Sequence, residues 1–297
     1  MFILFSLSAC ADAERPLYKP QYTANRPSGS TQFIFAPHPL MTPQKLAEVY
    51  GALVDQLNQR LARDRITLKL EASSSYAAFN EKLRGRKVHF ALPNPYQTVL
   101  AQDYGYKIFG KADRDEDFRG IILARRDFPL VSPLGLKGAT VAFPAPTALA
   151  ATMMPELFLK ENGLDPRSDI IQLFTGTHDS ALISACLGSA AAVCTWPRAW
   201  DMFQKEHPQE ARLLAVRWRT ASLPDNGLIA LNSVPEHVRS KVAQAFFQLH
   251  ESPEGRRIAL LSGTPRYIPA DNATYAPVHA FIARYNASVR PLKGLDE

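Results

Sequence analysis

Segments with the pattern of a buried β-strand alternate with segments that have the pattern of an amphipathic helix along most of the chain. Residues 32–36 (QFIFA) form the first such strand. Thr42 and Pro43 are residue types that begin helices, and apolar residues follow at helical spacing as far as Leu61. Residues 66–70 then alternate again as a strand. Because strands separated by crossover helices pair in parallel, this alternation predicts an α/β fold.

The alternation continues in a second set of segments. The other expected strands are residues 88–92, 106–109, 119–124, 139–143, 170–174, 191–195 and 213–218. The other expected helices are residues 73–83, a helix that begins near Tyr96, and residues 147–162, 177–187, 197–206, 235–250, 253–261 and 275–285. A chain of 297 residues is long enough for two domains that each bury a core. The sequence therefore predicts two α/β lobes, each a mixed, mostly parallel sheet flanked by helices.

The net charge of +6 does not indicate a nucleic-acid surface. The 34 basic residues are scattered among 28 acidic ones. The densest basic segment, residues 82–87, has no interleaved aromatic side chains on which bases could stack. We therefore expect a solvated basic surface with no nucleic-acid partner, and a charge balance that suits a small anionic ligand.

The N-terminus resembles a bacterial lipoprotein signal. A short apolar stretch ends in Leu7-Ser-Ala-Cys10, where small residues precede a cysteine, and a polar segment rich in proline follows. We expect residues 1–10 to be a lipoprotein signal in which Cys10 is lipidated and becomes the first residue of the mature chain. Residues 11–30 would then form a tether, and the protein would be a membrane-anchored periplasmic lipoprotein. Because no basic residue precedes the apolar stretch, the true start is expected upstream. The alternative is an apolar N-terminus with an unrelated cysteine.

Cys186 and Cys194 are the remaining thiols. Their spacing does not fit a paired metal or redox motif. In an oxidising compartment they could form a disulfide, and the alternative is two buried free cysteines, since both have small apolar neighbours.

Polar residues gather where expected strands give way to helices. In open α/β sheets ligands bind at the carboxyl ends of the strands, and helix N-termini there offer backbone N–H groups to an anion. The candidate ligand-binding residues are His38, Ser74, Ser75, Tyr76, Asn94, Tyr96, Thr147, Thr177 and His178. For each of these turns the alternative role is helix capping.

Signatures of enzymatic activity are missing from the sequence. It has no P-loop, GxGxxG, HExxH or GxSxG motif and no cysteine and histidine pair with zinc spacing. His178, Asp179 and Ser180 are successive residues of an expected helix, so their side chains diverge and cannot form a relay. We therefore expect a binding protein without cofactor or metal, and the least favoured alternative is an enzyme that uses His178 as a general base.

Several motifs occur in an order and spacing similar to those of the phosphonate, phosphate and phosphite-binding (PhnD-like) periplasmic proteins. The motifs are residues 70–76 (LEASSSY), 83–91 (LRGRKVHFA), 144–147 (PAPT), 161–165 (ENGLD) and 174–179 (FTGTHD). The resemblance covers roughly residues 31–270. It implies the two-lobed type II periplasmic-binding-protein fold and a monomeric substrate-binding component of an ABC transporter. A sensor that presents an oxyanion to a membrane histidine kinase is the alternative.

The resemblance also implies how the chain is divided. Lobe one would comprise residues 31–118 and 228–297, and lobe two residues 124–222. Residues 119–123 and 223–227 would be the hinge crossings, so that the lobes close on a ligand as a clamp.

Three family positions are matched here, and other family positions differ. Tyr76 matches a ligand-contacting tyrosine, Thr147 the middle residue of a Ser-Thr-Ser turn that grips the phosphonyl group, and His178 a histidine of the family's second-lobe turn. Pro146 and Ala148 replace the flanking serines.

Pro93 stands where some members have a tyrosine, and the segments that hold a ligand ammonium group in some members retain only Asp225. Because a buried ammonium group needs a carboxylate partner, the resemblance implies a compact oxyanion such as phosphate, phosphite or methylphosphonate. The expected partners are this ligand and an ABC permease.

Overall fold

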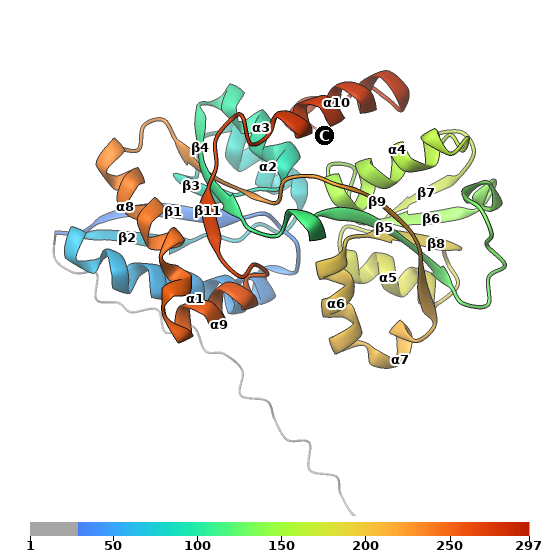
Figure 1. Ribbon diagram of the computed structural model, residues 1–297, viewed down its shortest axis with the longest axis horizontal. Coiled ribbons are helices and arrows are strands. Elements are labelled where there is room, and N and C mark those ends of the chain that lie inside the picture. Colours follow the sequence, from blue (N-terminus) through green and yellow to red (C-terminus); the bar gives the residue numbers. More distant parts are fainter. Residues whose placement is uncertain (1–28, 297) are drawn as a thin grey trace, which may run out of the picture.

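Two mixed β-sheets, each covered by helices on both faces, form the two lobes of the computed structural model (Figure 1). The structure describes residues 29–296. The first sheet has the strand order β11-β4-β10-β3-β1-β2 and the second has the order β7-β6-β8-β5-β9. Cys10 and residues 11–28 of the expected tether lie outside the described residues.

The first sheet comprises β1 (Thr31–Pro37), β2 (Ile66–Leu70), β3 (Phe90–Leu92), β4 (Tyr106–Ala112), β10 (Gly227–Leu231) and β11 (Tyr267–Pro269). β1 pairs in parallel with β2 and β3, whereas β10 and β11 pair in antiparallel fashion with their neighbours. β10 and β11, the antiparallel strands, come after the chain has returned from the second lobe to the first. The sheet is therefore mixed, with fewer parallel pairings than the sequence pattern predicts.

Five helices cover the first sheet: α1 (Pro43–Leu61), α2 (Tyr76–Arg84), α3 (Pro95–Leu100), α8 (Glu236–Phe247) and α9 (Pro253–Leu261). A further helix, α10 (Ala276–Ser288), packs on α3 and on α4 (Met154–Glu161) of the second lobe. The predicted start of α1 is confirmed, because the Thr42 side chain accepts a hydrogen bond from the backbone N–H of Lys45 and Pro43 occupies the first helical position. Leu46, Tyr50 and Leu53 form its buried face. This apolar stripe fixes α1 against the sheet.

The second sheet comprises β5 (Arg119–Arg125), β6 (Thr140–Phe143), β7 (Ile171–Phe174), β8 (Ala192–Thr195) and β9 (Leu214–Ser222). It is covered by a π-helical turn η5 (Leu149–Met153) that continues into α4 (Met154–Glu161), and by α5 (His178–Cys186), α6 (Pro197–Glu206) and α7 (Pro208–Ala211). Alternate residues of β5 enter different hydrophobic clusters, with Ile121 and Leu123 in one and Ile122 and Ala124 in the other. The second lobe therefore has a core on each face of its sheet.

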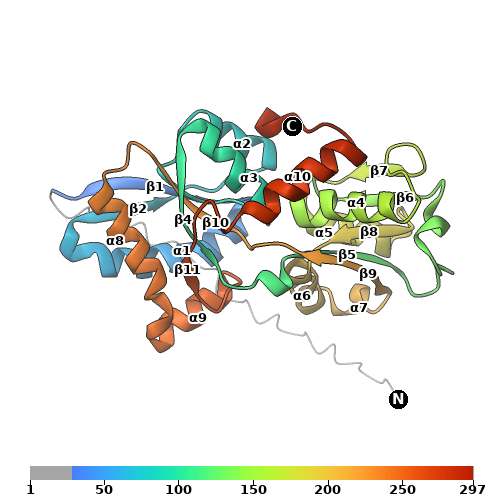
Figure 2. The same cartoon turned by 45° about the horizontal axis from the view of Figure 1, so that its top comes forward.

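Two crossings connect the lobes. One lies between β4 and β5 and the other between β9 and β10, and Figure 2 shows both passing between the sheets. Residues 119–123, expected as a crossing, are extended and belong to β5, where Ile121 pairs with Thr195 of β8. The lobe boundaries given above stay a prediction.

The lobes are in contact. The large hydrophobic cluster of the first lobe also contains Leu149, Met153, Leu157 and Trp196 from the second. Lys45 on α1 forms an ion pair with Glu206 on α6. These contacts hold the two lobes in a closed arrangement.

The two remaining cysteines are free, which contradicts the disulfide alternative. Cys186 belongs to the hydrophobic cluster on one face of the second sheet, and Cys194 belongs to the cluster on the other face. Because the sheet separates the two thiols, they cannot approach to bonding distance.

Within residues 29–296, none of the helices combines the length and the apolar character that a bilayer crossing requires. The same part of the chain has no group of three or more His, Cys, Asp or Glu side chains arranged to hold a metal ion.

Candidate functional site

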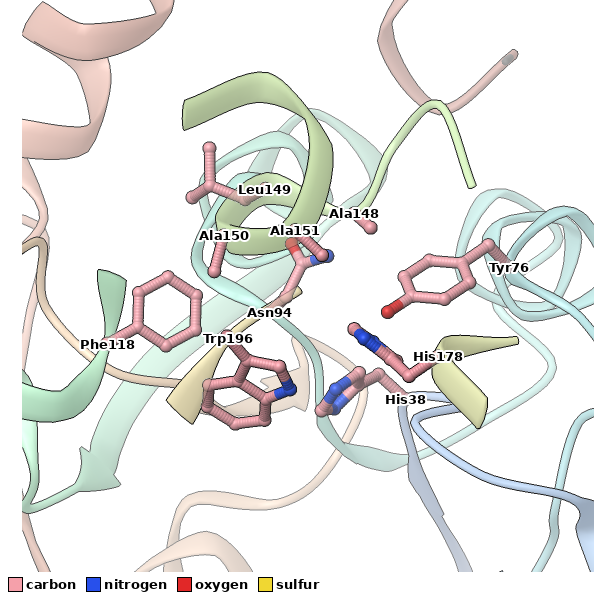
Figure 3. A pocket seen from close by; sticks show the side chains of 10 residues that line it. All are labelled: His38, Tyr76, Asn94, Phe118, Ala148, Leu149, Ala150, Ala151, His178 and Trp196. Carbon is pink, nitrogen blue, oxygen red and sulfur yellow. The ribbon is translucent and has the colours of Figure 1, made fainter. Parts of the chain in front are cut away.

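A small cavity lies between the lobes at the carboxyl ends of strands from both sheets (Figure 3). Its volume is about 20 Å³. The lining residues are His38, Tyr76, Asn94, Phe118, Ala148, Leu149, Ala150, Ala151, His178 and Trp196. None of these is a Lys, Arg, Asp or Glu, so the wall carries polar groups without formal side-chain charge.

His38 follows β1 in the first lobe and is 3% exposed. Its Nδ1 lies 3.3 Å from the carbonyl oxygen of Leu92. Burial, assisted by the positive charge of Arg198, lowers the pKa of His38 to about 4. The imidazole is therefore neutral at physiological pH.

Tyr76 is the first residue of α2, and Ser75 caps that helix by accepting a hydrogen bond of 3.1 Å from the N–H of Ala78. The Tyr76 ring lies edge-on to His38 with ring centroids 6.3 Å apart. Its hydroxyl points into the cavity toward His178 (Figure 3). Burial raises the pKa of Tyr76 well above its usual value, so the hydroxyl keeps its proton.

His178 is the first residue of α5 in the second lobe and is 4% exposed. Its Nδ1 lies 2.8 Å from the hydroxyl oxygen of Thr195. Burial, with a smaller contribution from His38, lowers the pKa of His178 to about 3. The cavity thus holds two neutral imidazoles, one from each lobe.

Trp196 is a cavity residue that the sequence did not reveal. It lies between β8 and Pro197 at the start of α6, the same place in the second lobe that Asn94 has between β3 and Pro95 in the first. Its ring packs edge-on against Phe118, with centroids 5.5 Å apart, and its indole nitrogen faces the cavity (Figure 3). This repeated strand, turn and Pro-initiated helix is the signal by which Trp196 could have been found.

Backbone N–H groups form a further part of the cavity wall. Ala148 to Ala151, at the beginning of η5, all line the cavity, and the first N–H groups of a helix have no acceptor within the helix. A helix begun in this way offers N–H donors and a partial positive charge to an anion. The two side-chain hydroxyls that the Ser-Thr-Ser turn would supply are absent, because Pro146 and Ala148 occupy those positions.

Thr147 and Asn94 link the lobes beside the cavity. Thr147 is 1% exposed and does not line the cavity, although the residues after it do. Its carbonyl oxygen accepts a hydrogen bond of 3.1 Å from Nδ2 of Asn94. Oδ1 of Asn94 caps α3 by accepting from the N–H of Gln97 at 2.9 Å. Asn94 therefore lines the cavity but uses both ends of its amide for structure.

Four other predicted residues lie outside the cavity lining. Tyr96 is fully buried in the core and donates its hydroxyl hydrogen to the carbonyl of Gly294 at 3.0 Å. Ser75 and Thr177 cap α2 and α5. Ser74 is exposed beside Ser75. The structure thus shows Ser75 and Thr177 in helix capping, the role that was expected as the alternative to ligand binding.

Asp225 lies in the second crossing and does not line the cavity. Its backbone N–H donates to Asp115 at 2.9 Å, and Asp115 also pairs with the buried Lys111 at 2.5 Å. Burial raises the pKa of Asp225 to about 7. The backbone of Asp225 thus ties the two crossings together, while its carboxyl group accepts a hydrogen bond of 2.6 Å from the N–H of Asn226.

The comparisons with known proteins agree with this geometry. Residues 35–275 match the profile of a protein family described as "ABC transporter, phosphonate, periplasmic substrate-binding protein". A binding protein component of an ABC phosphonate transporter from Pseudomonas aeruginosa superposes with a TM-score of 0.78 at 16% identity, covering 86% of this chain and 87% of that one.

Two further solved structures extend the comparison. PhnD1 from Prochlorococcus marinus in complex with methylphosphonate superposes with a TM-score of 0.77 at 17% identity, covering 86% of this chain and 98% of that one. The aliphatic sulphonate binding protein SsuA from Escherichia coli gives a TM-score of 0.61 at 14% identity, covering 89% and 90%. These structures confirm the predicted two-lobed fold.

Proposed function

The chain belongs to the family of periplasmic substrate-binding proteins of phosphonate ABC transporters, and on this premise we propose that it captures a small phosphorus oxyanion in the cavity between its lobes. Members of this family bind a transported substrate and are not enzymes. The proposed ligands are phosphate, phosphite and simple phosphonates such as methylphosphonate, delivered to an ABC permease.

One observation supports this proposal above the others: polar groups from both lobes converge on the cavity and are not satisfied by the protein. They are the Tyr76 hydroxyl and His38 Nε2 from the first lobe, and His178 Nε2 and the Trp196 indole N–H from the second. Within the described part of the chain, none of these four atoms makes a hydrogen bond. Because buried polar groups are normally paired, these four are available to a ligand.

The nature of the groups favours an oxyanion of small size. The Tyr76 and Trp196 hydrogens and the first N–H groups of η5 are donors, which suits a ligand rich in acceptor oxygens. Alanine and aromatic side chains make up much of the lining, so a large substituent on phosphorus would meet them. A compact anion is therefore favoured.

An aminoalkylphosphonate is disfavoured for an electrostatic reason. No carboxylate lines the cavity, and the nearest acid of the second crossing, Asp225, already interacts with Asn226, Arg198 and Lys111. A ligand ammonium group would lose its hydration without gaining a charged partner.

Binding requires motion of the lobes. The residues that line the cavity are buried between the closed lobes, so entry of a ligand needs the two crossings to bend and the lobes to separate. The ligand then favours closure to the extent that it binds the closed arrangement more tightly than the open one.

The proposal is tested by titrating the purified protein with phosphate, phosphite, methylphosphonate, 2-aminoethylphosphonate and sulfate, and recording both heat and melting temperature. A true ligand at about 100 times its dissociation constant stabilises the folded state by about 2.7 kcal/mol. We expect at least one of the first three compounds to bind more tightly than 2-aminoethylphosphonate and sulfate. Failure of all three to bind would exclude the proposal.

A sensor role is the second candidate, in which the closed, ligand-bound form contacts a membrane histidine kinase. Pro146 and Ala148, which remove the two serine hydroxyls of the phosphonyl-binding turn, are compatible with such a change of role. Reconstitution distinguishes the two: a permease and its ATPase should show ligand-dependent ATP hydrolysis with this protein, whereas a sensor partner should show ligand-dependent autophosphorylation.

We further propose that Cys10 is lipidated and that the anchored protein acts as a monomer. A Cys10→Ala variant expressed in a bacterial envelope should be released from the membrane fraction and lose the mass of the lipid. Sedimentation of the soluble body should give a single species of monomer mass.

A further inference from the structure

The hydrogen-bonding role of His38 is fixed by its neighbour on the same lobe. Its Nδ1 lies 3.3 Å from the carbonyl oxygen of Leu92, and a carbonyl can only accept. Nδ1 must therefore hold the ring's hydrogen. In a neutral imidazole with a hydrogen on Nδ1, Nε2 has a lone pair and accepts.

The surroundings keep this ring neutral. The charge of Arg198 on α6 acts on the ring, and the Arg198 guanidinium group lies against Gly263 and donates to the carbonyl of Leu261 at 3.3 Å. Gly263 has a φ of +96°, which favours glycine. From α5 the ring faces the neutral His178, and from α2 the protonated Tyr76.

No acid faces His38 from the cavity wall. Burial and the Arg198 charge hold the pKa of His38 at about 4, so above pH 5 its Nε2 stays an acceptor.

Two side chains of the cavity therefore have hydrogen-bonding roles that cannot reverse. His38 Nε2 is the acceptor, and the Trp196 indole N–H is the donor. A fully deprotonated oxyanion offers lone pairs alone, which suit Trp196 but oppose the lone pair of His38. An oxyanion that still bears one O–H suits both.

We propose that His38 makes the site selective for oxyanions that carry a proton, because the ligand O–H donates to His38 Nε2. This inference rests on the proposed function and specifies its ligand: the singly protonated monoanion of a phosphonate, phosphite or phosphate. A sulfonate has the same shape but bears no proton at neutral pH, so the site rejects it. His38 is thus a specificity-determining residue, distinct from the donors that bind any oxyanion.

The experiment compares methylphosphonate with methanesulfonate, which differ in whether one oxygen carries a hydrogen. Their dissociation constants are measured by calorimetry, with competition for the weaker ligand, between pH 5.5 and 8.5. A titrating protein group such as Asp225 affects the binding of both anions, so its effect cancels in the ratio of the two constants. Because the charge of the sulfonate does not change, the pH dependence that remains comes from the proton of the phosphonate.

For the wild-type protein we expect methanesulfonate to bind on the order of 100-fold more weakly at pH 5.5, since a buried acceptor left unpaired is costly. Above the second pKa of methylphosphonate, the ratio should fall about tenfold per pH unit as the protonated form disappears. His38→Phe should bring the ratio close to one at every pH. Trp196→Phe, the matched control, should weaken both ligands and leave the ratio unchanged.

The proposal is overturned if the wild-type ratio is near one, if it does not vary with pH, or if Trp196→Phe changes it as much as His38→Phe. The wild-type pH profile tests the proposal even if His38→Phe does not fold. If methylphosphonate and methanesulfonate bind equally well, this inference fails and the proposed function stands. If no phosphorus oxyanion binds at any pH, both fail.

Discussion

Asn94 of the first lobe donates a hydrogen bond of 3.1 Å to the backbone carbonyl of Thr147 in the second lobe, directly beside the cavity. The same side chain caps α3, because its Oδ1 accepts from the N–H of Gln97 at 2.9 Å. One amide thus couples the stability of a helix to the closure of the lobes.

The two roles of Asn94 can be separated by substitution. Asn94→Ser keeps an oxygen able to cap α3 but is too short to reach Thr147, whereas Asn94→Ala removes both interactions. We expect Asn94→Ala to lower the free energy of unfolding by about 1 to 2 kcal/mol and Asn94→Ser by less. Both should increase the radius of gyration of the ligand-free protein in X-ray scattering. An unchanged radius for Asn94→Ser would show that this bond does not hold the lobes together.

The buried imidazoles predict how stability responds to acid. The pKa values of His38 and His178 fall to about 4 and 3 in the folded protein, below the unfolded value near 6.5. The unfolded chain therefore binds more protons in this window, and stability decreases as pH falls from about 6.5 toward 3. Urea unfolding at pH 7 and 4.5 should show a drop that becomes smaller in His38→Gln and His178→Gln. An equal drop in these variants and in a variant of the exposed His237 would contradict this.

Asp225 predicts the opposite dependence on pH. Burial raises its pKa to about 7, so the folded state binds more protons than the unfolded chain between about pH 4 and 7. The stability that this group contributes is present below about pH 4 and is lost as pH rises from there through 7. This loss opposes the gain from the two histidines, so between pH 4.5 and 7.5 the urea midpoint should rise more in Asp225→Asn than in the wild type. Equal changes in the two proteins would mean that Asp225 is ionised throughout.

The two free thiols give a covalent prediction. Cys186 and Cys194 lie on different faces of the second sheet. Protein unfolded in denaturant with iodoacetamide and no reductant should carry the label on both cysteines in peptide mass spectrometry. A peptide pair joined through Cys186 and Cys194 would refute the assignment of free thiols.

Much of the fold could be predicted because periodicity and capping are local properties. The Thr42-Pro43 start of α1 follows from residue types alone. The central strand β10 was less evident: residues 223–227 were expected to form a crossing and no strand was expected after them, whereas Gly227–Leu231 is a strand buried between β3 and β4. A strand in that position gives an unbroken apolar run with no alternation to mark it.

Residues that line the candidate site were predicted where position along the chain determines the direction of a side chain. His38, Tyr76 and His178 begin or precede helices after strands, and all three reach the cavity. Thr147 does not, because the cavity is lined from Ala148 onward, and a shift of one residue at a helix start turns the side chain by about 100°. Trp196 was not predicted to line the cavity, because hydroxyl and imidazole side chains were taken as the candidate ligand-binding groups and an indole N–H was not.

The pairing of the cysteines could not be read from their spacing. Cys186 lies at the end of a helix and Cys194 in a strand, so the sheet face that each thiol reaches depends on packing and register. From the sequence, a disulfide and two free thiols were both possible. The second sheet lies between the two thiols and so excludes the disulfide.

The central claim is that one small phosphorus oxyanion is held by groups from both lobes, and calorimetric titration with methylphosphonate and phosphite tests it most directly. Tyr76→Phe removes a hydroxyl from the first lobe and Trp196→Phe an indole N–H from the second, while Tyr104→Phe, outside the cavity, serves as the control. A hydrogen bond to a charged group contributes about 1.5 to 3 kcal/mol, so each of the first two variants should raise the dissociation constant about 10- to 100-fold. The control should bind like the wild type. Wild-type affinity in either cavity variant, or no binding of a phosphorus oxyanion by the wild type, would contradict the claim.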